Sequence, residues 1–245
     1  MPRTILVTGA SSGIGRAVAE RFMAEGWNVG LLARRANLLE EVAGGRANAV
    51  AVPADVADWP SVEAAFAEVA ARFGRIDALF NNAGISKPAG LIDEIPLQDW
   101  LDTVNVNLTG MFLCARAAFA RMRRQDPQGG RIINNGSISA HAPRPGSVAY
   151  TAAKHGVTGL TKTLALDGRP FGISAGQIDI GNAVSAMGSR MAKGVPQADG
   201  SIRPEPLMPV EDAATAVLTM ATLPPGTNVL TMTVMATSMP FVGRG

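Results

Sequence analysis

The sequence predicts a single α/β domain, a Rossmann-like doubly wound sheet of about seven parallel strands with helices on both faces. One observation is that short β-branched runs alternate with longer segments of helical periodicity along the chain. The other is composition: hydrophobic residues make up 47% and charged residues 17%, as expected for a sheet buried on both faces. No linker or internal repeat divides residues 1–245, so we expect one domain.

The expected strands are runs rich in Val, Ile and Leu, and the expected helices carry apolar residues three or four positions apart. Strands are expected over residues 4–8 (TILVT), 28–32 (NVGLL), 49–52 (AVAV), 78–80 (ALF), 131–135 (RIINN), 173–178 (ISAGQI) and 229–234 (VLTMTV). Helices are expected over residues 14–25, 38–43, 62–73, 100–124, 148–167 and 210–222. Residues 182–209 are rich in Gly, Pro and Met, which predicts an irregular segment. Because this segment follows a strand end, where such sheets bind ligands, we interpret it as a substrate lid.

Composition also bears on partners and location. The formal net charge is +2 and no basic run reaches five residues, so we expect no nucleic-acid partner. No stretch approaches the ~18 apolar residues of a membrane span, and the N-terminus lacks a signal-peptide pattern. Cys114, the single cysteine, cannot form an internal disulfide. We therefore expect a cytoplasmic protein with no membrane partner.

A glycine-rich turn follows the first expected strand and opens the first helix, with the sequence TGASSGIG at residues 8–15. Glycines there allow a tight turn and bring a pyrophosphate close to the helix N-terminus. One such motif is weak evidence, but its position between strand and helix favours dinucleotide binding. The residues expected to bind are Gly9, Ser11, Ser12, Gly13, Ile14 and Gly15.

The spacing Gly-x-x-x-Gly-x-Gly resembles that of the short-chain dehydrogenase/reductase family, and further motifs of the family follow in order. They are Asp55-Val56, Asn81-Asn82-Ala83-Gly84, Asn107, Ser137 and Tyr150-Thr151-Ala152-Ala153-Lys154. The resemblance implies that Asp55 and Val56 bind the adenine and that Asn82, Ala83 and Gly84 line the adenosine side of the cofactor. The alternative is that Asp55 caps a turn and the asparagines shape a loop.

Tyr150 and Lys154 lie four residues apart in a helical pattern, which places them on one helix face. A tyrosine pKa is near ~10, and we expect the Lys154 ammonium to lower it so that Tyr150 serves as acid/base. An isolated pair of this kind is more often an ordinary helix surface pair. The ordered motifs around it favour catalysis, and both residues are also expected to contact the cofactor.

Two further residues complete the catalytic set that the resemblance implies. Ser137, thirteen residues before the tyrosine, would hydrogen-bond the substrate oxygen, with Ser139 as the rival candidate. Asn107 would hold a helix open so that water links Lys154 to solvent, and the Asn-x-x-Gly pattern selects it over Asn105.

The sequence departs from the family after the sixth strand. The family usually has Pro-Gly followed four residues later by Thr, at a loop that contacts the nicotinamide. Here Ile180-Gly181 precedes Ser185. We expect Ala183 and Ser185 to contact the cofactor, although Ser185 could simply cap the next helix. We interpret Asp179 as structural.

Several side chains are expected to line the substrate site. His141 and Arg144 lie between the serine and tyrosine motifs, and a partly apolar pocket is expected from Met187, Met191, Leu207 and Met208. His155 is expected to be solvated. Neither histidine has metal-ligand spacing, so no metal is expected.

The end of the second strand favours NADP(H) over NAD(H). An NAD-binding site usually carries an acid about 20 residues beyond the glycine motif, and this position holds Ala33. Arg34 and Arg35 follow, and a guanidinium pairs well with a 2′-phosphate. The alternative is that both arginines are merely solvated.

Together these features predict an NAD(P)-dependent oxidoreductase that interconverts a carbonyl and an alcohol on a small molecule. The alternative is a non-catalytic dinucleotide sensor on the same fold, which the presence of all four catalytic residues disfavours. Sugars, ketones, steroids and acyl thioesters all remain possible substrates, because specificity lies in the site and not in the fold. The long apolar helices predict a homodimer or homotetramer.

Overall fold

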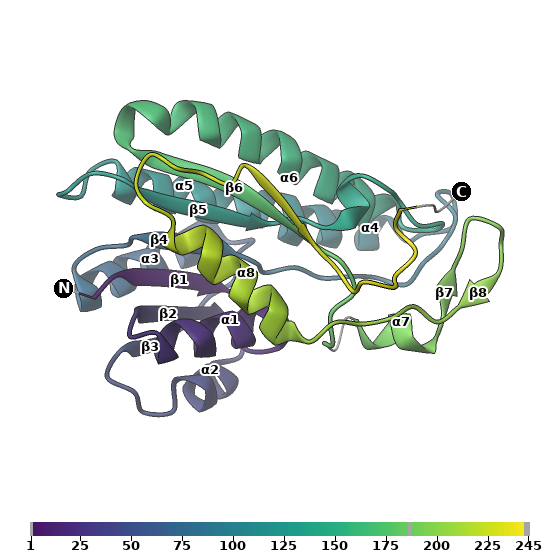
Figure 1. Ribbon diagram of the computed structural model, residues 1–245, viewed down its shortest axis with the longest axis horizontal. Coiled ribbons are helices and arrows are strands. Elements are labelled where there is room, and N and C mark those ends of the chain that lie inside the picture. The colour runs from purple at the N-terminus through teal and green to yellow at the C-terminus, as the bar shows by residue number, and fades with distance from the viewer. Residues whose placement is uncertain (1, 186–187, 243–245) are drawn as a thin grey trace.

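The computed structural model describes residues 2–185 and 188–242, and within them a seven-stranded parallel sheet has the order β3-β2-β1-β4-β5-β6-β9 (Figure 1). This confirms the predicted fold class. The strands are β1 (Thr4–Thr8), β2 (Asn28–Ala33), β3 (Ala49–Pro53), β4 (Ala78–Asn81), β5 (Gly130–Asn135), β6 (Ile173–Ile180) and β9 (Thr231–Val234). The predicted strands are found, with bounds that differ by up to two residues.

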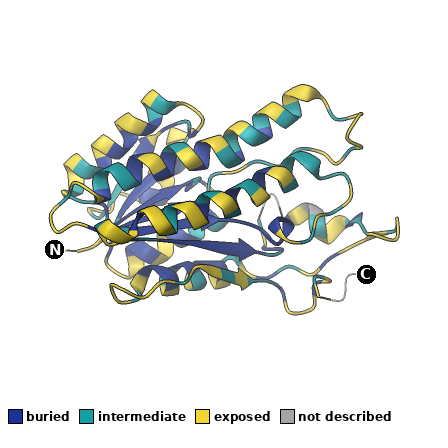
Figure 2. Ribbon diagram, turned by 90° about the horizontal axis from the view of Figure 1, so that it is seen from above, coloured by how far each residue is buried: buried dark blue, intermediate teal, exposed yellow. Residues whose placement is uncertain are grey.

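Helices cover both faces of the sheet, so the strands lie buried between two layers (Figure 2). One layer holds α1 (Gly13–Ala24), α2 (Ala36–Ala43) and α8 (Val210–Thr222). The other holds α3 (Trp59–Phe73), α4 (Leu97–Val104), α5 (Gly110–Met122) and α6 (Val148–Asp167). Alternate residues of β1 serve the two cores: Ile5 and Val7 pack on the α1 side, and Leu6 packs on the α3 side.

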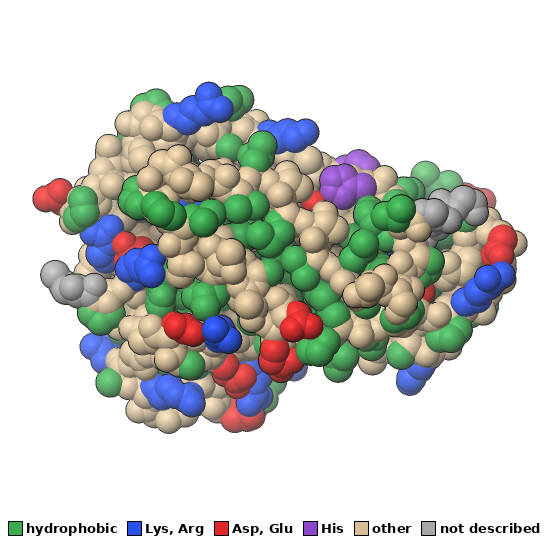
Figure 3. Space-filling view, viewed as in Figure 1, with side chains coloured by type: hydrophobic (Ala, Val, Ile, Leu, Met, Phe, Trp, Pro, Cys, Tyr) green, Lys and Arg blue, Asp and Glu red, His purple; other side chains and the backbone are tan. Residues whose placement is uncertain are grey.

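The surface is mixed in charge, with Lys and Arg interspersed among Asp and Glu on the face shown in Figure 3. Over residues 2–185 and 188–242, no helix combines the length and the apolar character that a bilayer span requires.

The single helix expected over residues 100–124 was wrong in detail. The chain forms α4, then the π-helical turn η1 (Asn105–Thr109), and then α5. A π turn inserts one extra residue into a turn without ending the helix, so apolar periodicity on either side still looks helical. The turn lies where the Asn107 side chain bonds outside the helix.

The segment 182–209 is more ordered than the sequence predicted. It contains α7 (Ser189–Lys193) and a short antiparallel pair of β7 (Val195–Pro196) and β8 (Ile202–Arg203), which project at one end of the molecule (Figure 1). Backbone bonds at a bridge between Ala183 and Met208 tie its two ends together. Met187, one of the predicted pocket residues, lies outside the described residues.

Candidate active site

The turn between β1 and α1 requires glycine at particular positions. Gly9 has φ +68° and Gly13 has φ +56°, a region that L side chains rarely adopt. A Cβ on Gly15 would lie 2.3 Å from the Gly9 carbonyl oxygen. Ser12 precedes α1 without capping it through its side chain, so the first backbone N–H groups of the helix have no side-chain acceptor there. This turn therefore offers backbone donors to an anion.

The turn forms the base of a cleft of about 300 Å³, which we call the main cleft, at the carboxyl ends of the strands. The cleft brings together most of the residues predicted to bind a cofactor: Gly9, Ser11, Ser12, Gly13, Ile14, Gly15, Arg34, Arg35, Asp55, Val56, Asn82, Ala83, Gly84, Tyr150, Lys154 and Ser185. Ala183 instead lines the neighbouring pocket. The lining also includes residues that the sequence did not single out: Ala54, Ile85, Val106 and Asn135.

Arginines lie at one end of the main cleft. Arg35 Nη2 donates to Ser11 Oγ at 3.0 Å and to Ser12 Oγ at 3.3 Å, which brings its guanidinium beside the glycine-rich turn. Arg34 is exposed at the same end. Within the described ranges neither arginine forms an ion pair. Both guanidinium charges therefore remain available to an anionic ligand.

Asp55 lies at the end of the main cleft beyond β3 and also has a local structural role. Its carboxylate accepts the backbone N–H of Ala57 at 2.9 Å, and its own N–H donates to Ser61 Oγ at 3.0 Å. The turn-capping alternative is thus present in the structure, while the residue also lines the cleft.

A hydrogen-bonded cluster joins the ends of β1, β4 and β5 at the middle of the main cleft. Thr8 Oγ1 accepts the N–H groups of Asn82 and Ala83 at 2.8 and 2.9 Å. Asn135 Nδ2 donates to Asn82 Oδ1 at 2.9 Å. Asn135 Oδ1 is buried and has no hydrogen-bond partner among the described residues. The main cleft thus offers an unpaired buried acceptor, the backbone donors of the glycine turn, and two arginines that have no carboxylate partner among the described residues. These features fit a dinucleotide.

Helix α6 places Lys154 at the inner end of the main cleft. Its side chain is buried, with 3% exposed, and Nζ donates to the Asn135 carbonyl oxygen at 2.7 Å. Burial lowers the pKa of Lys154 to about 8, against an opposing effect of the nearby Asp179 carboxylate. The ammonium lies 5.6 Å from the centroid of the Tyr150 ring.

Tyr150 lies at the junction of the main cleft and the second pocket, and lines both. Burial raises its pKa, while a hydrogen bond with Ser137 and the charge of Arg144 act in the opposite direction. The expectation that Lys154 lowers the pKa of Tyr150 is not met in this structure. The Lys154 ammonium is directed to a backbone carbonyl, and the cation that acts on the phenol is Arg144.

Ser137 and Ser139 have different roles, although both line the second pocket. Ser137 Oγ accepts the Ser139 N–H at 3.1 Å and hydrogen-bonds Tyr150. The backbone N–H of Ser137 donates to Asp179 Oδ1 at 2.8 Å. Of the two candidate serines, Ser137 is therefore the one whose hydroxyl lies beside the tyrosine.

Asn107 lies behind the cleft wall, fully buried in the π turn. Its Oδ1 accepts the Ile85 N–H at 2.7 Å, and its Nδ2 donates to the Ile85 carbonyl at 2.8 Å. The side chain thus joins η1 to the loop after β4. Asn105 is exposed, so of the two candidates Asn107 is the one directed inward.

The second pocket, of about 240 Å³, extends from Tyr150 and Ser137 toward the 182–209 segment. Met191 of α7 lines it, as the sequence predicted. The prediction that Met208 lines the pocket is wrong, because Met208 packs in the hydrophobic core beside α8. The lining does not include Leu207.

Both basic side chains that line the second pocket have carboxylate partners. Lys87 Nζ lies 3.0 Å from Asp99 Oδ1 and 2.8 Å from Asp102 Oδ2. Arg144 pairs with Glu205 of the 182–209 segment. Burial alone would raise the pKa of Glu205, but its hydrogen bonds outweigh this and lower it. Neighbouring carboxylates therefore neutralise the positive charges that line the second pocket.

Comparison with known proteins agrees with this geometry. Residues 3–195 match the family described as short chain dehydrogenase. The chain is 38% identical over 192 residues to the 3-oxoacyl-[acyl-carrier-protein] reductase FabG of Staphylococcus aureus, covering 76% of this chain and 77% of the relative. It is 42% identical over 180 residues to the 2-(R)-hydroxypropyl-CoM dehydrogenase of Xanthobacter autotrophicus, covering 71% of each.

Solved structures share the whole architecture. The 3-ketoacyl-(acyl-carrier-protein) reductase from Brucella melitensis complexed with NADH has a TM-score of 0.85 at 27% identity, covering 95% of this chain and 96% of that one. An actinorhodin polyketide ketoreductase with NADPH has a TM-score of 0.85 at 28% identity, covering 96% of each chain.

Proposed function

The chain belongs to the short-chain dehydrogenase family of NAD(P)-dependent oxidoreductases, and on that premise we propose that it interconverts a carbonyl and an alcohol with Tyr150 as acid/base. One observation carries the proposal: Tyr150 lines both the main cleft and the second pocket. A group held between the two spaces is placed to exchange a proton with a substrate that meets the cofactor there.

In the direction of reduction, the Tyr150 hydroxyl donates a proton to the carbonyl oxygen. Ser137 Oγ accepts a hydrogen bond from the Ser139 N–H and lies beside the Tyr150 hydroxyl, where it would donate its own proton to the same substrate oxygen. When bound, the nicotinamide supplies or accepts the hydride at the carbon.

Lys154 and the turn after β1 would hold the dinucleotide. One ammonium hydrogen of Lys154 is used by the Asn135 carbonyl, and two remain for ribose hydroxyls. The N–H groups at the start of α1 would bind the pyrophosphate. In the oxidation direction the charge of Arg144 and the hydrogen bond with Ser137 favour the phenolate of Tyr150, and Asn107 holds η1 against the loop after β4.

We propose NADP(H) as the preferred cofactor, because Arg34 and Arg35 directly follow Ala33, the position where an NAD site carries an acid. Solved relatives are described with NADH and with NADPH, so the choice rests on this chain's own residues. The parent should prefer NADPH by at least tenfold in kcat/KM, about 1.4 kcal/mol. Ala33→Asp combined with Arg34→Ala should reverse the preference. Equal use of both cofactors by the parent would overturn the assignment.

The substrate is proposed to be a small molecule that bears the carbonyl or alcohol, held in the second pocket and covered by the 182–209 segment. We also propose a cytoplasmic homodimer or homotetramer. Apolar side chains on the outer faces of α4 and α5 remain exposed in the single chain: Leu97 (72%), Leu101 (43%) and Phe112 (49%).

The test is a screen of ketones, aldehydes, hydroxysteroids and 3-oxoacyl thioesters with NADPH and NADH, followed by nicotinamide absorbance. Turnover of any substrate by the parent, and its loss in Tyr150→Phe, is the expected result. If the protein binds a dinucleotide tightly but turns over no substrate of the panel, the proposal that it is an enzyme is contradicted and a non-catalytic sensor is favoured.

A further inference from the structure

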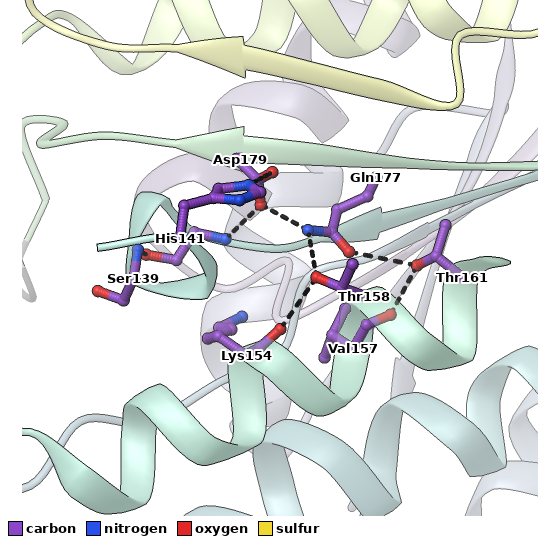
Figure 4. Close-up of polar contacts among 9 residues, drawn as sticks. Ser139, His141, Lys154, Val157, Thr158, Thr161, Gln177 and Asp179 are labelled. Atoms are coloured by element: carbon purple, nitrogen blue, oxygen red, sulfur yellow. Dashed lines mark hydrogen bonds and ion pairs between the residues drawn. The ribbon is translucent and has the colours of Figure 1, made fainter. Parts of the chain in front are cut away.

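A fully buried carboxylate, Asp179, lies directly behind the catalytic serine. Its Oδ1 accepts the Ser137 backbone N–H at 2.8 Å and Gln177 Nε2 at 2.7 Å. Its Oδ2 lies 2.8 Å from His141 Nε2, as Figure 4 shows. Both oxygens of the carboxylate are therefore engaged, one by the backbone of the serine and one by an imidazole.

The backbone around Ser137 is built to admit this carboxylate. Gly136 precedes the serine, and a Cβ there would lie 2.1 Å from Asp179 Oδ1. Any other residue would push the carboxylate away from the Ser137 N–H. The position of Ser137 and that of Asp179 are thus mutually dependent.

The same cluster reaches α6. Gln177 Nε2 also donates to Thr158 Oγ1 at 3.1 Å, and Thr158 lies one turn after Lys154, whose carbonyl its hydroxyl contacts at 3.5 Å (Figure 4). Asp179 therefore has contacts that lead to the serine after β5 and to the lysine on α6.

The groups around Asp179 balance its charge. A buried carboxylate without a partner is strongly destabilising. Here the imidazole of His141, whose side chain is 42% exposed, lies 2.8 Å from one carboxylate oxygen. Lys154 on α6 supplies a positive charge nearby, and Asp179 raises the pKa of Lys154 against the effect of burial.

Among the described residues, the two strands that pair with β6 add no charge at this end, and the first turn of α8 carries the exposed Glu211 and Asp212. Strand β9 carries no ionisable residue, and the single one on β5, Arg131, bonds at the opposite end of the sheet. Within the described residues the lining of the second pocket includes neither Asp179 nor His141. They therefore act on substrate only through other groups.

We propose that Asp179, supported by His141, is a positioning residue that fixes Ser137 at the reacting carbonyl and, through Gln177 and Thr158, the turn of α6 that carries Lys154. The inference rests on the proposed function and assigns this pair a role in it. Loss of the carboxylate should lower kcat rather than raise KM, because the substrate pocket itself is unchanged.

The experiment compares four substitutions, two at Asp179 and two, His141→Gln and His141→Ala, at the histidine. Asp179→Asn keeps an oxygen for the Ser137 N–H but removes the charge, and Asp179→Ala removes both. His141→Gln places an amide nitrogen near the position of Nε2. Asp167→Asn and His155→Asn change exposed residues of α6 and serve as controls.

Asp179→Asn should lower kcat by about tenfold or more, with KM and dinucleotide affinity within about threefold of the parent. Its alkaline decline in kcat should begin at lower pH, because Lys154 loses the carboxylate that favours its charged form. Asp179→Ala should lose more activity, and His141→Gln should retain more than His141→Ala. A kcat within about twofold of the parent, or an unshifted pH profile, would overturn the proposal.

Hydrogen exchange at the Ser137 amide separates this inference from the proposed function, because it needs no turnover. Exchange should accelerate about tenfold in Asp179→Ala and stay near the parent in Asp179→Asn. An unchanged rate in Asp179→Ala would sink the positioning role even if the enzyme is active. A parent inactive on every carbonyl would instead sink the proposed function. If Asp179→Ala does not fold, the kcat and pH profile of Asp179→Asn decide.

Discussion

Replacing Lys154 with Met should abolish turnover and yet leave the protein at least as stable near neutral pH. The lysine is buried, and its pKa falls from 10.5 to about 8. At roughly 1.4 kcal/mol per pKa unit, keeping it charged in the folded state costs about 3 kcal/mol at pH 7. Met leaves the Asn135 carbonyl without its donor, which costs about 1–3 kcal/mol. The net expectation at pH 7 is a variant between equal stability and about 2 kcal/mol more stable.

The sign of the pH dependence follows from the lowered pKa. Between about pH 8 and about pH 10.5 the unfolded chain binds the Lys154 proton and the folded chain does not, so the stability of the parent rises with pH in that window. Lys154→Met lacks this gain. By about pH 10 the parent should be the more stable protein, and the difference between the two should have changed by about 3 kcal/mol.

Urea unfolding followed by tryptophan fluorescence, at intervals across this pH range, measures the difference directly. Lys162→Met, which changes an exposed lysine on the same helix, is the control. If the difference in free energy of unfolding between the parent and Lys154→Met does not vary with pH, burial of the Lys154 ammonium does not destabilise the folded parent.

Two further predictions concern binding. Gly15→Ala should abolish dinucleotide binding measured by calorimetry, because its Cβ would lie 2.3 Å from the Gly9 carbonyl and must displace the turn; binding within about threefold of the parent would contradict this. Glu205→Gln should lower the free energy of unfolding by more than about 1 kcal/mol and raise the KM for substrate, because Arg144 then lacks its carboxylate beside the second pocket. Unchanged stability and KM would show that the pair does not order the 182–209 segment.

Local patterns predicted the fold because they reflect local physics. The bounds of β1, α6 and α8 agree with the predicted ranges, since each is a long periodic or β-branched segment. The π turn at Asn105–Thr109 was missed because the helix continues through it. The β7 and β8 pair was missed because it consists of two short strands within a Gly- and Pro-rich segment.

The residues of the candidate site likewise fall into those that the sequence could single out and those that only the structure brings together. Short motifs of fixed spacing contain the glycine turn, Ser137, Tyr150 and Lys154, so the sequence alone could single them out. The pairs that support them join distant positions: His141 with Asp179 across 38 residues, and Arg144 with a glutamate 61 residues away. Sequence periodicity gives the face on which a residue lies and not the distant side chain that it meets, so these pairs required the structure.

The central claim, that Tyr150 is the acid/base, is tested most directly by single-turnover hydride transfer in Tyr150→Phe, with dinucleotide affinity measured on the same preparation. The substitution keeps the ring and removes only the hydroxyl. We expect the rate of hydride transfer to fall by about 10²–10⁴, while the dissociation constant for the dinucleotide stays within about threefold. A variant that keeps more than about a tenth of the parent rate would contradict it.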